Sequence, residues 1–353
     1  MGQNFMNNND FEMNSQTFEN YQPQKTYVTY IPYGLTPETY EERKNIRKIA
    51  NIIGGALLIM SAISGTFVLL LRVILKTLGL WGINEFNFVS EPAFLQFLQV
   101  ILSTIMFTLP FLLLFSASGF SASRLVKFKR PKKEDILPFF LLGISFCAFA
   151  NISVSIIANI FASLGINYQV DFGEKPQGVL GFMLTFIATA IVPALVEEFA
   201  CRGLVLGALR KYGDGFAVLC SSILFGVMHG NFQQMPFAFL VGLVLGYITV
   251  KTNTIWIAVA VHCFNNAVSV IFEYATQGMS GLAQNVIFTI YLLVCLLLGI
   301  IGVYLLKNRE GAYKIKKAKI KSEQKQIYKW FFTSPTIIIF TVLSFIEALA
   351  FFK

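Results

Sequence analysis

The chain alternates long apolar blocks with short polar or basic gaps. The blocks lie at about 49–71, 94–117, 136–164, 178–200, 215–231, 235–250, 254–273, 285–306 and 333–352. Most approach the roughly 20 residues that an α-helix needs to cross a bilayer, and those at 215–231 and 235–250 are the shortest. The pattern therefore predicts an all-α integral membrane protein, a bundle of about 8–9 transmembrane helices.

The composition supports a membrane protein and excludes several other classes. Only 13% of the 353 residues are charged, whereas a soluble domain carries about a quarter. The net charge of +9 comes from lysines and arginines in the gaps between apolar blocks, where such residues orient a protein in the bilayer. We therefore expect a lipid bilayer as partner and no nucleic acid. The five cysteines lie within apolar blocks and form no C-x-x-C pair, so neither a disulfide framework nor a cysteine metal cluster is indicated.

The same pattern divides the chain into four parts. Residues 1–40 are rich in Asn, Gln, Tyr, Thr and Pro without apolar periodicity, which predicts a disordered polar tail. Residues 41–306 are the predicted transmembrane helical domain, with its functional core at 178–273. A basic cytosolic segment follows at 307–332, expected to lie against anionic lipid, and an additional C-terminal transmembrane helix at 333–353.

Positive charge is biased to alternate gaps. One set of gaps holds a cluster at 43–48, the loop 124–133, Arg210 with Lys211, Lys251, and the lysine-rich stretch 307–329. Cytosolic loops carry an excess of Lys and Arg. We therefore predict a multi-pass protein with a cytosolic N-terminus and a C-terminus on the other side.

Three charges stand inside an otherwise apolar stretch from Gly178 to Leu209, namely Glu197, Glu198 and Arg202. Ionisable groups at membrane depth are costly and usually face a bundle interior or a wet cavity. Glu198 and Arg202 are four residues apart with the acid first, so on a helix they share a face and neutralise each other. Glu197 lies about 100° away around the helix and has no local partner. Glu197 is therefore the one of the two carboxylates without a nearby positive charge on its own helix.

Both histidines of the chain lie in later apolar blocks, and the helix rise predicts that they stand level with Glu197. If Tyr212–Asp214 forms a turn, Glu197 and His229 are each roughly 24 Å from it. If the chain reverses again near 232–234 and 251–253, His262 and Asn266 lie roughly 16 and 20 Å from the level of that first turn. Four polar residues therefore fall in one layer. Each of them could also be a purely structural hydrogen-bonding group.

Two chemical schemes suit this set, and the residues leave both open. Glu197 with His229 can activate a water molecule as a general base, while His262 and Asn266 donate hydrogen bonds to the oxyanion that forms. Alternatively, Glu197, His229 and His262 can hold zinc with one open position. Both schemes hydrolyse an amide. The soluble zinc-protease signature H-E-x-x-H is absent.

Taken together, three short motifs resemble the CAAX-processing and bacteriocin-processing (CPBP, or Abi) family of intramembrane endopeptidases. They are E-E-x-x-x-R at 197–202, F-x-x-x-H at 225–229 and H-x-x-x-N at 262–266. The resemblance covers roughly 178–273. It implies about eight transmembrane helices around a polar cavity, with Glu197 and His229 activating water, and His262 and Asn266 stabilising the oxyanion. Members are commonly classed as metalloproteases.

The resemblance also sets the expected substrates and the rival functions. Eukaryotic relatives remove the last three residues of prenylated CAAX proteins, and bacterial relatives are linked to peptide processing and bacteriocin immunity. We therefore expect a membrane-embedded endopeptidase acting on a peptide or protein, lipidated or membrane-associated, with zinc or with no metal. Glu198 and Arg202 are expected to hold their helix in register. The alternatives are a catalytically silent scaffold or immunity protein of the same fold, and a proton-coupled transporter.

Overall fold

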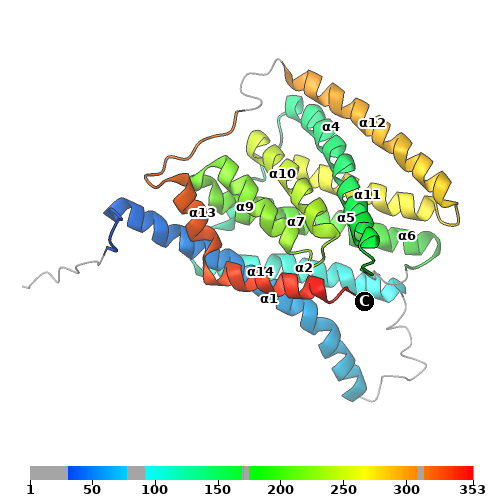
Figure 1. Ribbon diagram of the computed structural model, residues 1–353, viewed down its shortest axis with the longest axis horizontal. Coiled ribbons are helices and arrows are strands. Elements are labelled where there is room, and N and C mark those ends of the chain that lie inside the picture. Colours follow the sequence, from blue (N-terminus) through cyan, green and yellow to red (C-terminus); the bar gives the residue numbers. More distant parts are fainter. Residues whose placement is uncertain (1–30, 78–91, 169, 171–174, 308–313, 353) are drawn as a thin grey trace, which may run out of the picture.

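A computed structural model describes residues 31–77, 92–168, 170, 175–307 and 314–352. Every regular element among them is helical (Figure 1). The α-helices are α1 (Pro37–Thr77), α2 (Pro92–Ala117), α3 (Ala122–Leu125), α4 (Lys133–Ala150), α5 (Ile152–Ser163), α6 (Gly178–Phe186), α7 (Val192–Glu198), α8 (Leu206–Leu209), α9 (Asp214–Val227), α10 (Gln234–Thr252), α11 (Trp256–Ala275), α12 (Gly281–Lys307), α13 (Gln324–Phe332) and α14 (Pro335–Leu349). Two π-helical turns, η3 (Ile187–Ile191) and η4 (Phe199–Val205), and one 3₁₀ turn, η5 (Arg210–Tyr212), complete them.

The predicted all-α membrane fold is confirmed. Within the described residues, seven helices or continuous helical segments are long and apolar enough to cross a bilayer, and α13 with α14 gives up to eight if that bent pair is one span. The fifth predicted block is shorter than expected, because α9 has only 14 residues and ends at Val227. The bend of 62° between α13 and α14 separates an amphipathic helix from an apolar one.

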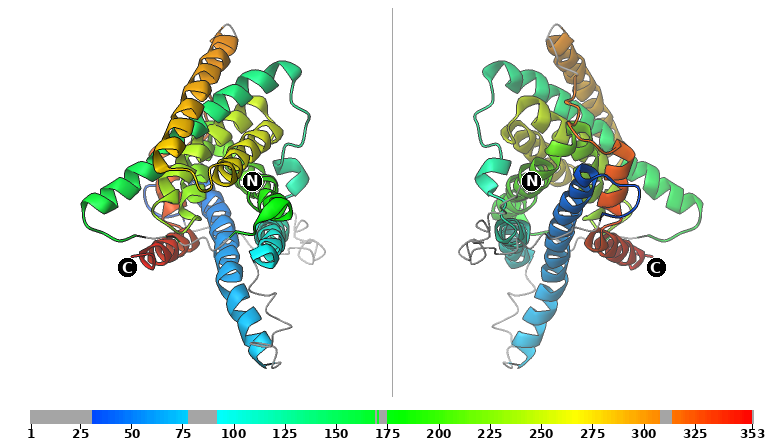
Figure 2. Two further views of the ribbon diagram at one scale, coloured as in Figure 1. Left: turned by 90° about the vertical axis from the view of Figure 1, so that its right-hand side faces the viewer. Right: turned by 90° about the vertical axis from the view of Figure 1, so that its left-hand side faces the viewer.

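The helices are arranged in three layers (Figure 1). The central layer contains the segment from α6 to α11. On one side α1 packs against α2, α13 and α14, and on the other α4 packs against α12. Figure 2 shows α1 extending beyond the other helices at one end. In the centre α9 and α10 pack closely, and the absence of a side chain at Gly242 allows this. A Cβ added at Gly242 would lie only 3.0 Å from the Ser222 backbone.

The basic gaps meet at one end of the molecule. The Asp214 N–H donates to the Lys316 carbonyl, and the Lys251 ammonium donates to the Lys314 carbonyl. The Ile255 N–H donates to the Lys127 carbonyl on a neighbouring segment. The structure thus gathers at one end the gaps that the charge pattern assigns to one side. The side of the membrane on which this end lies stays a prediction.

The predicted turns occur where the sequence indicates them. Gly213 has a φ of 111° between η5 and α9, and α10 begins at Gln234 and ends at Thr252, followed by Asn253 with a φ of 52°. With these turns, α11 packs against α7, and α10 packs against both α9 and α11. Most of the predicted polar tail, residues 1–30, lies outside the described residues.

Candidate functional site

The two glutamates lie on a helical segment that changes its winding twice. Between Gly178 and Tyr212 the chain passes from α6 through η3, α7, η4 and α8. Turns of π-helix are rare and occur mostly as single turns inside α-helices at functional sites. Pro193 contributes to the first of these turns, because it has no N–H to give to the carbonyl of Thr189 four residues earlier. That carbonyl is free to accept a different donor.

Glu198 is wholly buried and has two cationic or polar partners on one oxygen. Its Oε1 lies 2.9 Å from Nη1 of Arg202 and 2.9 Å from Nδ1 of His262. The Arg202 contact is an ion pair without the alignment of a hydrogen bond. The guanidinium carbon of Arg202 stands 4.1 Å from the ring centroid of Phe225, a cation–π contact. Glu198 therefore links α7 to α11 in addition to pairing with Arg202.

In both imidazoles Nδ1 has a hydrogen-bond partner, whereas Nε2 has none among the described residues. Nδ1 of His229 lies 2.7 Å from the carbonyl oxygen of Phe225. A carbonyl only accepts, so this Nδ1 carries the hydrogen and Nε2 keeps a lone pair. In the same way, Nδ1 of His262 donates to Oε1 of the Glu198 carboxylate. The Phe225 ring packs edge-on against both imidazoles, at centroid distances of 5.2 and 6.0 Å.

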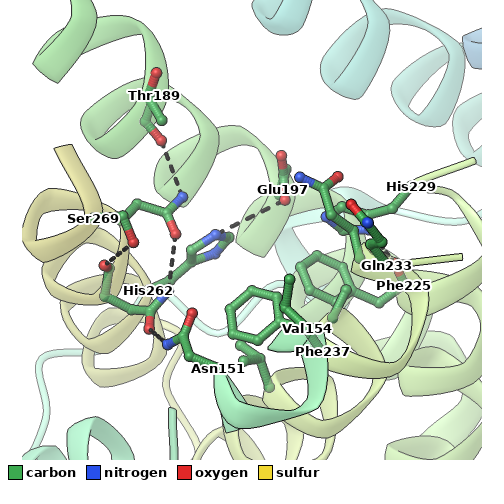
Figure 3. A pocket seen from close by; sticks show the side chains of 15 residues that line it. Asn151, Val154, Thr189, Glu197, Phe225, His229, Gln233, Phe237, His262 and Ser269 are labelled. Atoms are coloured by element: carbon green, nitrogen blue, oxygen red, sulfur yellow. Dashed lines mark hydrogen bonds and ion pairs between the residues drawn. The ribbon is translucent and has the colours of Figure 1, made fainter. Parts of the chain in front are cut away.

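A cavity of about 310 Å³ lies between these elements (Figure 3). It is lined by Asn151, Val154, Thr189, Glu197, Phe225, His229, Gln233, Gln234, Phe237, Ala238, Val241, His262, Asn265, Asn266 and Ser269. Glu197 has a side chain that is 14% exposed, against 0% for Glu198, so only Glu197 is reachable from the cavity. Its Oε2 lies 4.0 Å from Nε2 of His262. That spacing is longer than a hydrogen bond.

Asn266 also lines the cavity, and its carboxamide has partners at both ends. Its Nδ2 donates at 3.0 Å to the Thr189 carbonyl, to which Pro193 cannot supply the usual i+4 N–H. Its Oδ1 accepts from Nδ2 of Asn265 at 3.1 Å. Asn265 in turn accepts from Nδ2 of Asn151 at 3.3 Å. The orientation of this amide therefore depends on residues from three separate elements.

The structure brings Glu197, His229, His262 and Asn266 around one cavity, and it places Glu198 and Arg202 directly behind it. Their chemical roles stay predictions. Sequence reasoning did not single out Asn151, Asn265 or the Thr189 carbonyl. The sequence does contain a signal for the Thr189 carbonyl, because a proline four residues later removes its usual i+4 donor. The two asparagines had none, because only tertiary contact joins them.

The donor set for a metal is not preassembled. Among the described residues, no three His, Cys, Asp or Glu side chains stand close enough together to hold a metal ion. Nδ1 of each imidazole is already engaged, which would leave only Nε2 of His229 and His262 beside Glu197 as ligands. This arrangement does not fit a three-ligand zinc site as it stands.

Comparisons with known proteins agree with the motif pattern. Residues 179–268 match the family "Type II CAAX prenyl endopeptidase Rce1-like". The "Putative membrane peptidase YdiL" of Bacillus subtilis (strain 168) is 30% identical over 105 residues, 28% of this chain and 43% of that protein. The "Membrane-embedded CAAX protease MroQ" of Staphylococcus aureus (strain USA300) is 25% identical over 153 residues, 41% of this chain and 61% of that protein.

The matched regions thus cover less than two thirds of each relative. No solved structure matches the chain. The family match and all three motifs fall within the same central segment, α6 to α11, with His229 in the turn that follows α9. The predicted resemblance is therefore confirmed: residues 179–268 of this integral membrane protein match the family model described as Rce1-like.

Proposed function

We propose that the protein is a membrane-embedded endopeptidase that hydrolyses peptide bonds with a water molecule activated by Glu197 and His229. The observation that carries this proposal is the contrast between two adjacent carboxylates. Glu198 is buried and has two partners, while Glu197 lines the cavity and has no ion-pair contact shorter than 4.0 Å among the described residues. A largely buried acid that shares a cavity with two imidazoles suits proton transfer.

The proposed reaction begins with a water molecule in the cavity between Glu197 and His229. Its oxygen attacks the peptide carbonyl carbon while one proton passes to Glu197, whose partner His229 accepts a hydrogen bond from the same water at Nε2. The carbonyl oxygen becomes an oxyanion, which Asn266 stabilises by donating an N–H. The C–N bond then breaks, and the amine leaves with the proton held by Glu197. One water molecule is consumed for each bond.

His262 would take part as the second oxyanion partner only when its Nε2 carries a proton. Its Nδ1 already donates to Glu198, so donation from both nitrogens requires the imidazolium form. This condition separates the role of His262 from that of Asn266, whose amide donates at any pH.

The proposed substrate is a peptide or protein, lipidated or membrane-associated, that reaches the cavity from the bilayer. The support is the family match, the description of MroQ as a CAAX protease, and the location of the cavity among apolar helices. We further propose that the basic end faces the cytosol, because positive charge is concentrated there. A cytosolic N-terminus follows from that orientation.

The decisive experiment is a cleavage assay on detergent-purified protein with paired peptides, one bearing a C-terminal prenylated CAAX sequence and one without the lipid. Glu197→Gln and His229→Ala should each lower turnover by about 10²–10⁴-fold. Glu273→Gln is the matched control, because Glu273 lies on the same helix as His262 but pairs with Lys175 outside the cavity. Unchanged turnover in both cavity variants would end the proposal. Wild-type protein that protects cells from a bacteriocin but cleaves neither peptide would favour the catalytically silent scaffold or immunity protein instead.

A further inference from the structure

We propose that Asn151 and Asn265 are positioning residues for Asn266, because the three carboxamides form one directional hydrogen-bonded chain that decides which end of the Asn266 amide serves the cavity. This inference rests on the proposed function, since it concerns the group assigned to the oxyanion. It adds two residues that neither the three motifs nor their spacing identify. The chain is visible in Figure 3, between Asn151 and Thr189.

The three amides donate in one direction, each to the next acceptor in the hydrogen-bonded series. Nδ2 of Asn151 donates to Oδ1 of Asn265 at 3.3 Å, and Nδ2 of Asn265 donates to Oδ1 of Asn266 at 3.1 Å. Nδ2 of Asn266 then donates to the Thr189 carbonyl at 3.0 Å. Hydrogen bonds in such a chain polarise one another and strengthen together. The direction is therefore a property of the whole chain.

Backbone carbonyls at both ends prevent the amides from turning over. Nδ2 of Asn151 also donates to the Cys147 carbonyl at 2.9 Å, and Nδ2 of Asn266 meets the Thr189 carbonyl. A carbonyl oxygen can only accept. Reversing any one amide would set two oxygens or two N–H groups against each other. The chain thus fixes the nitrogen of Asn266 and leaves one of its two N–H groups for a ligand in the cavity.

Three helical elements supply the chain, and this explains why it can set geometry. Asn151 lies at the junction of α4 and α5, Asn265 and Asn266 lie on α11, and Thr189 lies on the π-turn η3. A carboxamide that pivots freely loses its value as an oxyanion donor, because stabilisation depends on donors held in place before the reaction. The alternative is that these bonds only join helices. The two roles predict different kinetics.

The test is a double-mutant cycle on the full chain with a cleavable peptide. Asn265→Ala and Asn151→Ala should each lower kcat by about 10- to 100-fold, the range found for residues that orient metal ligands through hydrogen bonds, with KM unchanged. In an Asn266→Ala background, neither change should lower kcat further, because the group that they position is gone. Asn265→Leu keeps the approximate size but removes the donor and the acceptor, so it should match Asn265→Ala. Asn285→Ala, an exposed asparagine on α12, is the control.

The outcomes separate this inference from the function on which it rests. Losses that add to that of Asn266→Ala, or that appear only in KM, would overturn the positioning role. If cleavage depends on Glu197 but is insensitive to Asn151 and Asn265, the inference fails alone. Wild-type protein without Glu197-dependent cleavage defeats the proposed function itself. Should the variants at 265 fail to fold, the cycle between Asn151→Ala and Asn266→Ala gives the same decision.

Discussion

Nδ1 of His262 and Nη1 of Arg202 both lie 2.9 Å from one oxygen, Oε1 of Glu198. The sequence predicts the pair of Glu198 with Arg202, because the two residues are four apart. It does not predict the contact with His262, which is 64 residues away along the chain. Glu198 therefore has two tasks. It neutralises a buried arginine, and it orients the imidazole that faces Glu197.

These two tasks can be separated by mutation. Glu198→Gln should destabilise the protein by about 3–5 kcal/mol, because it leaves Arg202 as an uncompensated buried charge. The double variant Glu198→Gln with Arg202→Met should recover much of that stability, since both charges are then absent. Its turnover should stay low, because His262 has lost its anionic partner. Thermal unfolding in detergent and the cleavage rate together test this, and full recovery of both would contradict the second task.

Phe225 is expected to matter although it has no reactive group. Its ring contacts the edges of both imidazoles and carries the Arg202 guanidinium on its face. Phe225→Leu removes the cation–π contact, worth up to about 2 kcal/mol when desolvated, and loosens both rings. We expect lower stability and lower kcat with little change in KM. Phe239→Leu, on the neighbouring helix α10 and outside the cavity lining, is the comparison. Equal effects of the two variants would show that Phe225 acts only through general packing.

Pro193→Ala should lower activity without destabilising the helix. The new N–H would compete with Asn266 for the Thr189 carbonyl and would allow an ordinary α-helical turn in place of η3. We expect kcat to fall while the unfolding temperature stays equal or rises. Pro138→Ala, in helix α4, provides a matched proline replacement outside the cavity. An unchanged kcat in Pro193→Ala would mean that Asn266 keeps its position without this free carbonyl.

The donor geometry predicts that cleavage survives removal of divalent metal. No preassembled three-ligand cluster occurs within the described residues, and a zinc site would require Glu197, His229 and His262 to move together. Dialysis against a chelator should therefore leave turnover within about two-fold, given the water-activation scheme. Metal content and turnover should be measured on the same sample. Stoichiometric zinc that is lost together with activity and restored with it would favour the metal scheme.

Topology can be tested with two exposed positions at opposite ends of the bundle. Lys317 belongs to the basic end, and Gln277 follows α11 at the other end. With the basic end in the cytosol, Gln277→Cys should react with an impermeant maleimide in intact cells, and Lys317→Cys should react only after permeabilisation. The native cysteines give a low background, because four are buried and Cys263 is partly buried. The reverse labelling pattern would invert the proposed orientation.

The sequence by itself determined the fold class, the turns and the depth of the polar layer. Apolar block lengths, glycine and asparagine at the turns, and a fixed rise per residue are local properties, so they place Glu197, His229, His262 and Asn266 at one level. The early end of α9 at Val227 was not predicted. Gly230, with a φ of 63°, was the available signal, because a glycine in this conformation commonly follows the end of a helix.

Only the tertiary structure decided which groups face one another at that level. Helix rotation depends on packing, and here two π-turns shift the register of the glutamate-bearing segment. For that reason His262 meets Glu198 as well as facing Glu197, and Asn266 is held by Asn265 and the Thr189 carbonyl. Contacts between helices far apart in sequence follow from how whole faces fit together, and no local pattern of residues encodes that fit.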